Sequence, residues 1–328
     1  MVRCFGLGLA LAVLFCGAAR AQEADEGATD DGFVFPVYLL AETAASGLVA
    51  WRPDWPVDIP VDAFDVLNDM SSRLVAALTL ESEGISLSAR RDSRGLLSEF
   101  PVLLDGVFYQ FTTNFDPDGK LRGFTAAGEK PLEILFLAFE NSGGEPSLAR
   151  IHDGESWFFA SILYRAALVV ETWYDADGNA LAVFTAELPD GRPTAFRSVF
   201  AAAAMENADP DEPSTPAPSE CRLYFDSMGN VTRVDAASGV AEALYDGAGP
   251  RYWDAPALGR LALQWDEAGR LVRMAGYAQD GTPLDYRYEY RLDGRGVWTE
   301  RREFRMTEEL GVLIPAPGAS FRRTIEYR

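Results

Sequence analysis

Carboxylate side chains are the most numerous groups of this chain that could bind a metal ion or take part in catalysis. Among 328 residues, 50 are acidic and 29 are basic, for a formal net charge of −21. Asp116 with Asp118, and Asp175 with Asp177 and Asn179, place several oxygen ligands close together, as a calcium site requires. The second segment has its glycine at the fourth place instead of the sixth, which excludes an EF-hand loop. Tight hairpin turns use the same residues, so we expect turns here and no metal or cofactor.

Paired carboxylates or a nucleophile would be needed for hydrolysis. Two carboxylates facing each other across a cleft could cleave a glycan, but 50 acidic residues single out no pair, and solvated sheet faces explain them equally well. The chain contains no nucleophile elbow, zinc-binding His-Glu-x-x-His, Cys-x-x-Cys pair, P-loop or dinucleotide fingerprint. We expect the single histidine, His152, at a turn or strand end, and Cys221 in the core. No catalytic residue is therefore predicted.

Aromatic side chains supply the remaining candidate site. Between residues 284 and 292, Leu and Tyr alternate with Asp, Arg and Glu, which predicts a strand with one aromatic face and one face of opposite charges. Such rings can stack on a sugar, an apolar ligand or a partner protein, although aromatic residues of this kind more often pack a core. The candidate ligand or partner surface consists of Trp265, Tyr286, Tyr288, Tyr290 and Trp298.

A recurring turn unit predicts how these residues are positioned. An aromatic residue is followed by Asp, two variable residues, Gly, a polar residue and an apolar one, most clearly at 115–121, 174–180, 225–231 and 265–271. Looser copies stand at Asp190-Gly191, Asp280-Gly281 and Asp293-Gly294. Asp starts a tight turn through a side-chain hydrogen bond to the backbone, and Gly adopts positive φ. Neighbouring glycines 12 or 13 residues apart leave room for one strand of roughly eight or nine residues, which predicts an antiparallel meander.

The repeated Tyr/Trp-Asp-x-x-Gly-Arg-Leu pattern resembles the YD-type repeats of exported bacterial proteins. Tyr288-Glu289-Tyr290, leading to the Gly-Val-Trp-Thr-Glu-Arg segment at 296–301, belongs to the same resemblance, which covers about residues 105–328 and is closest over 263–327. The resemblance implies extended β-sheets, sometimes shells or supports, that are not themselves catalytic. Because the copies here are few and irregular, it does not imply an encapsulating shell. Residues 33–83 lie outside it.

The expected fold class is mainly β, an antiparallel meander of hairpins with one N-terminal α-helix. Asp62 is a candidate N-cap, and the apolar residues that follow it at helical spacing are Ala63, Leu67, Met70, Leu74 and Leu78. Residues 22–32 form an acidic leader that need not fold, and 33–200 hold the helix and a sheet region. Residues 201–220 are a loop or linker rich in Pro, Ala and acidic residues, and 221–328 hold the C-terminal repeats. One sheet and two domains are both compatible with this pattern. Alternating residues from Phe321 to Tyr327 predict that the chain ends inside the sheet.

The N-terminus has the layout of a secretory signal. Arg3 precedes an apolar run from Phe5 to Phe15, and Ala19-Arg20-Ala21 forms a small-residue cleavage site. Cys16 allows an alternative in which the signal is cut before a lipid-modified cysteine, although Phe15 stands where such signals carry a small residue. No later stretch reaches the roughly 18 apolar residues of a membrane-spanning helix. We therefore expect an exported protein, periplasmic or extracellular.

The strongly acidic composition narrows the expected function. A net charge of −21 repels nucleic acid, so no nucleic-acid partner is expected. We expect a non-catalytic binding or structural protein of the cell envelope, with an envelope protein, a glycan or a lipid as its partner. The alternatives are a periplasmic carrier of a lipid or another apolar ligand, and a carboxylate-dependent glycan hydrolase.

Overall fold

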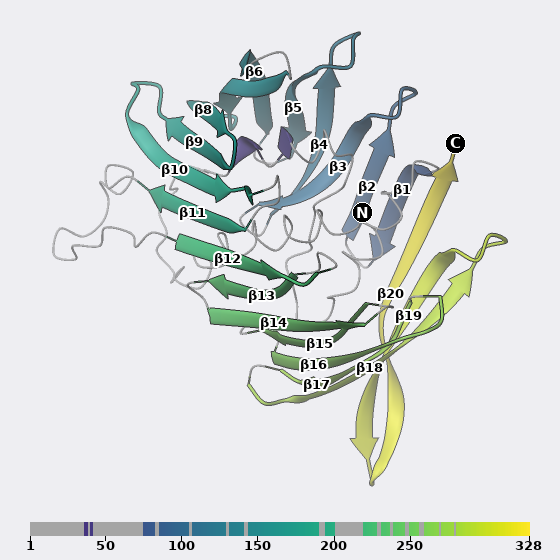
Figure 1. The fold of residues 1–328 in the computed structure, drawn as a ribbon. Helices are drawn as coiled ribbons and strands as arrows, with labels where there is room; N and C mark the ends of the chain where they lie inside the picture. The colour runs from purple at the N-terminus through teal and green to yellow at the C-terminus, as the bar shows by residue number, and fades with distance from the viewer. Residues whose placement is uncertain are drawn as a thin grey trace.

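The chain folds into one antiparallel sheet of twenty strands (Figure 1). The computed structural model describes residues 36–38, 40–41, 75–82, 85–104, 107–128, 131–140, 144–189, 194–200, 219–227, 231–236, 239–246, 249–255, 259–268, 270–278 and 280–328. The first ten strands are β1 (Val75–Ser82), β2 (Ile85–Arg91), β3 (Leu97–Leu104), β4 (Val107–Phe115), β5 (Leu121–Ala127), β6 (Leu132–Glu140), β7 (Glu145–His152), β8 (Trp157–Arg165), β9 (Leu168–Tyr174) and β10 (Ala180–Glu187). The others are β11 (Ala195–Phe200), β12 (Ser219–Phe225), β13 (Val231–Ala236), β14 (Gly239–Asp246), β15 (Gly249–Ala255), β16 (Gly259–Trp265), β17 (Leu271–Tyr277), β18 (Pro283–Leu292), β19 (Trp298–Glu309) and β20 (Val312–Tyr327).

The strand order is that of a meander, as the turn spacing predicts. Each strand pairs antiparallel with the next one along the chain, and β20 pairs with β1, which closes the sheet into a ring. In the closing pair, Leu78 lies opposite Ile325 and Glu81 lies opposite Arg322. The last strand therefore ends inside the sheet. Figure 1 shows the C-terminus beside β1, at the end of the long β20.

The connecting turns have the geometry expected of the repeat. In the β4–β5 turn, the Gly119 amide donates to the Asp116 carbonyl at 2.9 Å, and Gly119 has a φ of 82°. The β9–β10 turn repeats this, with Gly178 at a φ of 87°. A β-branched or aromatic residue would be strained there, which explains the recurring glycine.

One further copy of the turn lies between β2 and β3, and it is not among the copies identified from the sequence. The Gly95 amide donates to the Asp92 carbonyl at 3.0 Å, and Gly95 has a φ of 97°. The residue before Asp92 is an arginine, so the aromatic element of the pattern is absent. The hydrogen bonds need only the Asp-x-x-Gly spacing, so the turn forms without it.

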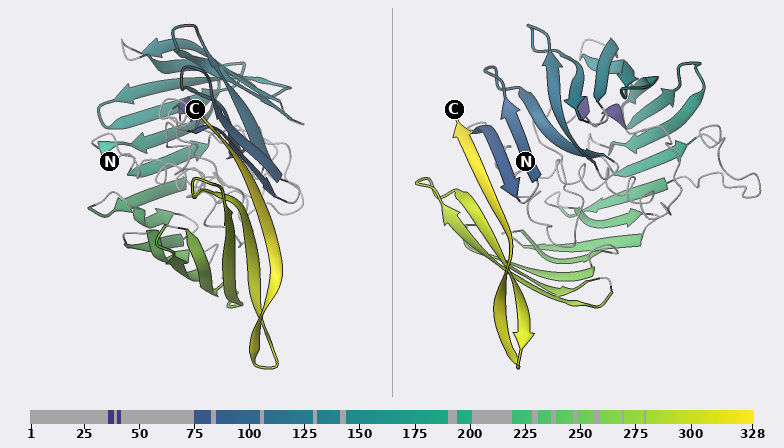
Figure 2. Two further views of the ribbon diagram at one scale, coloured as in Figure 1. Left: turned by 90° about the vertical axis from the view of Figure 1, so that its right-hand side faces the viewer. Right: turned by 180° about the vertical axis from the view of Figure 1, so that it is seen from behind.

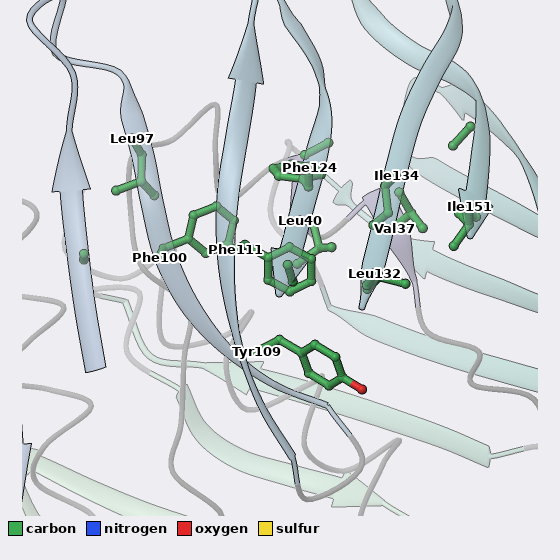
Figure 3. Packing of buried hydrophobic residues seen from close by; sticks show 14 of the residues in the cluster. Val37, Leu40, Leu97, Phe100, Tyr109, Phe111, Phe124, Leu132, Ile134 and Ile151 are labelled. Carbon is green, nitrogen blue, oxygen red and sulfur yellow. The ribbon is translucent and has the colours of Figure 1, made fainter. Parts of the chain in front are cut away.

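The core fills the side around which the sheet curves. Phe100, Phe111, Phe124 and Phe136 are buried and form a ladder across neighbouring strands, with adjacent ring centroids 5.8–6.0 Å apart. Figure 3 shows Val37 and Leu40, from the N-terminal helical residues, packed among Phe111, Phe124 and Ile134. Residues that precede the first strand thus pack against part of the inner face.

The N-terminal helix expected from Asp62 to Leu78 is not confirmed. Residues 62–74 lie outside the described residues, and Val75 and Leu78 belong to strand β1, so the helix does not extend to Leu78. Strand β1 pairs with β2 on one side and with β20 on the other. Leu78 and Leu80 are both buried, as expected for residues two apart on the same face of a strand. The described helical residues are instead Val37, Tyr38, Leu40 and Ala41. Within the described residues, no helix has the length and apolar character needed to cross a bilayer.

The regions on either side of the expected linker share one sheet. Strand β11 pairs with β12 from Ala195 opposite Arg222 to Ser198 opposite Ser219. Residues 201–218 lie outside the described residues, while Ser219 and Glu220 already belong to β12. The sheet therefore continues from the N-terminal strands to the C-terminal repeats.

Candidate functional site

The inner face of β18, β19 and β20 holds the most unusual group of side chains in the described structure. In one cross-strand row, Arg301 of β19 lies between Tyr290 of β18 and Phe321 of β20. In the next row, Glu303 lies opposite Tyr288. Three charged side chains, Arg301, Glu303 and Arg323, are at least 96% buried in this region. We call this set, together with Tyr288, Tyr290, Trp298 and Phe321, the arginine–aromatic cluster.

Arg301 is surrounded by aromatic rings. The side chain is fully buried, and its guanidinium carbon lies 4.2 Å from the Phe321 centroid and 5.6 Å from that of Tyr288. The Trp298 centroid is 5.9 Å away. A cation over the face of an aromatic ring is attracted by the ring quadrupole, and a guanidinium is weakly hydrated for a cation, so both effects reduce the cost of burying this charge.

Arg323 ties β20 to β19. Its Nε donates to the Trp298 carbonyl at 2.7 Å, and its guanidinium carbon lies 3.8 Å from the centroid of the Trp298 ring. Only 4% of the residue is exposed. The one side chain thus satisfies a backbone acceptor and covers an indole face, at the place where the ring of strands closes.

Gly318 makes room beside the carboxylate of the cluster. A Cβ at this position would lie 2.8 Å from Glu303 Oε1, so any larger residue would displace that side chain. Glu303 is itself 4% exposed. Glycine at position 318 therefore allows β20 to lie over the buried carboxylate.

The five residues of the predicted ligand or partner surface occupy different environments. Tyr286, Tyr288 and Trp298 are buried, whereas Tyr290 and Trp265 are partly exposed. The structure brings Tyr288, Tyr290 and Trp298 into the cluster, and the Tyr290 hydroxyl donates to the Leu271 carbonyl at 2.8 Å. Tyr286 lies farther along β18, and Trp265 ends β16. The aromatic face thus points inward, away from any partner on the outer surface.

The sequence analysis missed the arginines of this cluster. Alternation from Phe321 through Ile325 to Tyr327 assigns these residues to one face, and Arg323 occupies the remaining position of that series. In a strand every second residue faces the same way, so an arginine that stands between apolar residues of one face is the signal that could have identified it. Arg301 had no such signal. Arg291 pairs with Glu300 and Leu292 pairs with Trp298, so a bulge interrupts the alternation of β19 just before Arg301.

A second buried charge lies on the opposite side of the ring. Glu171 of β9 is 0% exposed, and its two oxygens accept the Val37 and Tyr38 amides, each at 2.8 Å. The Trp173 indole also donates to Glu171 at 2.6 Å. Burial raises the pKa of Glu171 to about 7, and these three hydrogen bonds oppose the shift. One carboxylate therefore holds the N-terminal helical residues against the sheet.

The turn carboxylates act as backbone acceptors. Asp175 Oδ1 accepts the Asp177 and Asn179 amides, at 2.9 and 2.8 Å, and Oδ2 accepts the Asn179 side-chain amide at 2.8 Å. The hydrogen bonds from Asn179 lower the pKa of Asp175. At Asp116, hydrogen bonds from the Lys120 amide and the Arg122 guanidinium lower the pKa in the same way. These oxygens stabilise hairpin turns, the role that the sequence pattern predicts for them.

His152 and Cys221 lie on strands of the sheet. His152 ends β7, and its ring centroid is 4.3 Å from that of Trp157, the first residue of β8. Cys221 lies in β12 opposite Ala236. His152 is thus at a strand end, as expected.

The chemistry open to the arginine–aromatic cluster is electrostatic. Guanidinium groups keep their proton at any physiological pH, so they are poor general acids but strong partners for carboxylate or phosphate groups. Within the described residues, no group of three potential metal ligands converges. The cluster can thus hold strands together or attract an anion.

Comparisons with known proteins assign no family. No family model matches the chain, and no curated protein matches it. Among solved structures, a porin-like protein from Bacteroides uniformis has a TM-score of 0.31 at 12% identity, over 77% of this chain and 96% of that chain. A porin-like protein from Bacteroides vulgatus gives the same TM-score and identity, over 77% and 98%.

A third solved structure contains the complex TcdB2-TccC3-Cdc42. Its TM-score is 0.25 at 12% identity, and the match covers 68% of this chain but 16% of that chain. At these values, none of the similarities assigns the protein to a family or to a function. The mainly β architecture that the YD-type resemblance implies is nevertheless present in the structure itself.

Proposed function

We propose that the protein is exported and acts in the cell envelope as a non-catalytic binding or structural component. The observation that carries the proposal is that the ionisable side chains with the most hydrogen bonds in the described structure stabilise the fold itself. Asp116 and Asp175 are fixed in turns, Glu171 holds the N-terminal residues, and Arg323 joins two strands. The signal-like N-terminus supports export.

The two buried carboxylates of the described structure do not form a hydrolytic pair with each other. A glycosidase needs an acid and a second carboxylate roughly 5–10 Å apart. Glu171 and Glu303 are the buried acidic residues of the described structure, and they lie on β9 and β19. These strands are ten pairings apart in either direction around the ring. Glu171 also has its oxygens occupied by three donors, which leaves it poorly placed to protonate a leaving group.

Cell fractionation and native mass spectrometry test the proposal. The protein, tagged at its C-terminus and produced in its own cells, is expected in the envelope fraction with the mass of a chain beginning at Gln22. A full-length chain in the cytosol would overturn the export. A bound lipid or other apolar ligand that leaves on activation would instead favour the carrier.

An activity assay addresses the enzyme alternative directly. Purified protein is incubated with envelope glycans, beside the variants Glu171→Gln and Glu303→Gln. We expect no product from any of the three. Glycan cleavage by the wild-type chain that either substitution abolishes would contradict the non-catalytic role.

A further inference from the structure

The described residues that precede the first strand lie on the inner side of the sheet. We call Pro36, Val37, Tyr38, Leu40 and Ala41 the strap. Figure 1 and the right-hand view of Figure 2 show it, in purple, on the concave side of the curved sheet. Apart from Pro36, its residues are at most 5% exposed, so the strap is packed as closely as the core of the sheet itself.

A single carboxylate receives the first backbone amides of the strap. The Val37 amide donates to Glu171 Oε1 and the Tyr38 amide donates to Oε2, each at 2.8 Å. The Trp173 indole donates to Oε1 as well, at 2.6 Å. Because two successive amides meet the two oxygens of one side chain, Glu171 fixes both the position and the direction of the strap on the sheet.

Among the described residues, no positive charge compensates the carboxylate of Glu171. The side chain is 0% exposed, and the residues opposite it on the neighbouring strands are Ile162 of β8 and Phe184 of β10. The other titratable side chains on the inner faces packed around it are Tyr38 of the strap and Tyr164 of β8. Phenols carry no positive charge in either protonation state. No charged side chain contributes to the pKa shift of Glu171.

Burial without a counter-charge favours the protonated form of Glu171. An ionised carboxylate out of water is costly, and the three hydrogen bonds offset only part of that cost. Burial raises the pKa to about 7 while the strap is in place, against an ordinary value of 4.5 in water. The closed arrangement therefore binds more protons than one in which Glu171 is hydrated, and opening becomes easier as pH rises from about 4.5 to about 7.

Movement of the strap is the smallest change that hydrates Glu171. Strand β9 is paired with β8 on one side and with β10 on the other, from Leu168 to Tyr174. The strap reaches Glu171 from outside this ladder, so its departure breaks no strand pairing. Openings of a short segment cost less free energy than unfolding of the strands beneath it.

We infer that the strap is a pH-sensitive closure of the inner face, shut while Glu171 is protonated and opened by its ionisation. Opening withdraws Val37 and Leu40 from the core, where they pack among buried rings (Figure 3), and uncovers apolar surface on the concave side of the sheet. The inference goes beyond the proposed function and does not depend on it, because it concerns one carboxylate and one segment in any compartment.

Hydrogen exchange of the intact protein, resolved to single amides by mass spectrometry, measures the opening. At each pH, the Val37 and Tyr38 amides should be less protected than the amides of β9, because the strap opens while the sheet stays folded. After correction for the intrinsic pH dependence of exchange, protection of the two strap amides should fall at least about tenfold from pH 5 to pH 8. Protection equal to that of β9, or no fall with pH, would overturn the inference.

Two substitutions test whether Glu171 is the group responsible. Glu171→Gln has no ionisable group at this position, so protection of its strap amides should not depend on pH. Glu187→Gln removes an exposed carboxylate from the adjacent strand β10 and should retain the full pH dependence of the wild-type chain. A fall that persists in Glu171→Gln would assign the effect to another group and contradict the inference.

Trp173→Phe keeps the carboxylate and so provides a test that does not require Glu171→Gln to fold. The substitution removes one of the three donors that favour the ionised form of Glu171. The pH at which the fall in strap protection is complete should therefore move upward. An unchanged or lower value would show that ionisation of Glu171 does not open the strap. Cell fractionation tests the envelope location separately, so failure of that proposal is distinguishable from failure of the closure.

Discussion

Single buried side chains connect distant parts of this molecule. Glu171 accepts two backbone amides from residues more than 130 positions earlier in the chain. Arg323 bridges to the Trp298 carbonyl, 25 positions away. Burying an ionised group is costly unless its hydrogen bonds are made, so each of these residues adds stability only while its partners are in place. The N-terminal helical residues and the C-terminal strand are thus linked to the sheet by polar contacts.

The stability of the protein should fall as pH rises through the titration of Glu171. Its folded-state pKa of about 7 exceeds the ordinary value of 4.5, so the folded protein binds more protons than the unfolded chain between these values. The contribution is favourable below about pH 4.5 and is lost by about pH 7, a difference of roughly 3 kcal/mol. Urea unfolding of wild type and Glu171→Gln at several pH values should give free-energy differences that change over this interval. Parallel curves would show that Glu171 titrates normally.

Replacement of Arg323 by lysine should destabilise the fold although it preserves the charge. The ammonium group of lysine has no planar surface to stack on Trp298 and no Nε donor for the Trp298 carbonyl. We expect a loss of about 2 kcal/mol in urea unfolding. Arg322→Lys, at the adjacent exposed position, is the control and should change stability by less than about 0.5 kcal/mol. Equal effects would contradict a specific role of the buried guanidinium.

Elements in this fold are defined by their turns. The Asp266 carboxylate accepts the Ala268 and Arg270 amides at 2.9 Å through one oxygen, and the Arg270 guanidinium at 2.7 Å through the other. Burial alone would raise the pKa of Asp266, but the hydrogen bonds from Arg270 outweigh it and lower the pKa. The turn sets where β16 ends and β17 begins, and therefore the register of the pair.

Asp266→Ala should lower stability by about 2 kcal/mol, because the turn amides lose their charged acceptor. Glu267→Ala removes a neighbouring exposed carboxylate from the same turn and should have little effect. The stabilisation by Asp266 exists above its ordinary pKa of 3.8 and is lost as pH falls through its lower folded value. Thermal unfolding of the two variants at pH 7 and pH 3 measures both effects. An equal loss in the two variants at pH 7 would contradict the turn assignment.

The whole molecule depends on closure between its first and last described strands. Strand β20 covers β1 from Val75 opposite Tyr327 to Glu81 opposite Arg322. The Arg328 guanidinium donates to the Asp92 carbonyl of the β2–β3 turn at 2.7 Å. Without these contacts, β1 would become an open edge, which invites pairing with other chains.

Deletion of residues 322–328 should therefore be severely destabilising. The closing ladder is lost together with the buried Arg323, which we expect to cost on the order of 5 kcal/mol, at about 1 kcal/mol for each hydrogen bond. Urea unfolding and light scattering should show a lower midpoint and association. Leu310→Asn, in the turn between β19 and β20, serves as the control: Leu310 has a φ of 53°, a conformation that asparagine adopts more readily, so stability should be equal or slightly higher. A truncated chain as stable as wild type would show that the ring is not closed in solution.

Alternation and turn spacing predicted much of this architecture. The tyrosines of β18 share one face as predicted, because successive side chains of a strand point to opposite faces, and the structure shows that this face points inward. The same rule assigns Glu171 to the face of Val169 and Trp173, yet its acceptor role was not predicted, since nothing near it identifies Val37 or Tyr38 as donors. The helix expected to reach Leu78 failed because apolar residues four apart fit a helix and a strand face equally well.

The sequence by itself determined the strands after residue 85, the turns and which residues of a strand share a face, since these follow from short-range hydrogen bonding and side-chain periodicity. The tertiary structure alone decided that β20 pairs with β1, that Arg301 lies among three aromatic rings and that the β19–β20 hairpin extends beyond the neighbouring strands (Figure 1). These features depend on the register between strands and on contacts between residues far apart in the chain. A strand that closes a ring has the same local pattern as one at an edge, so only its neighbours distinguish them.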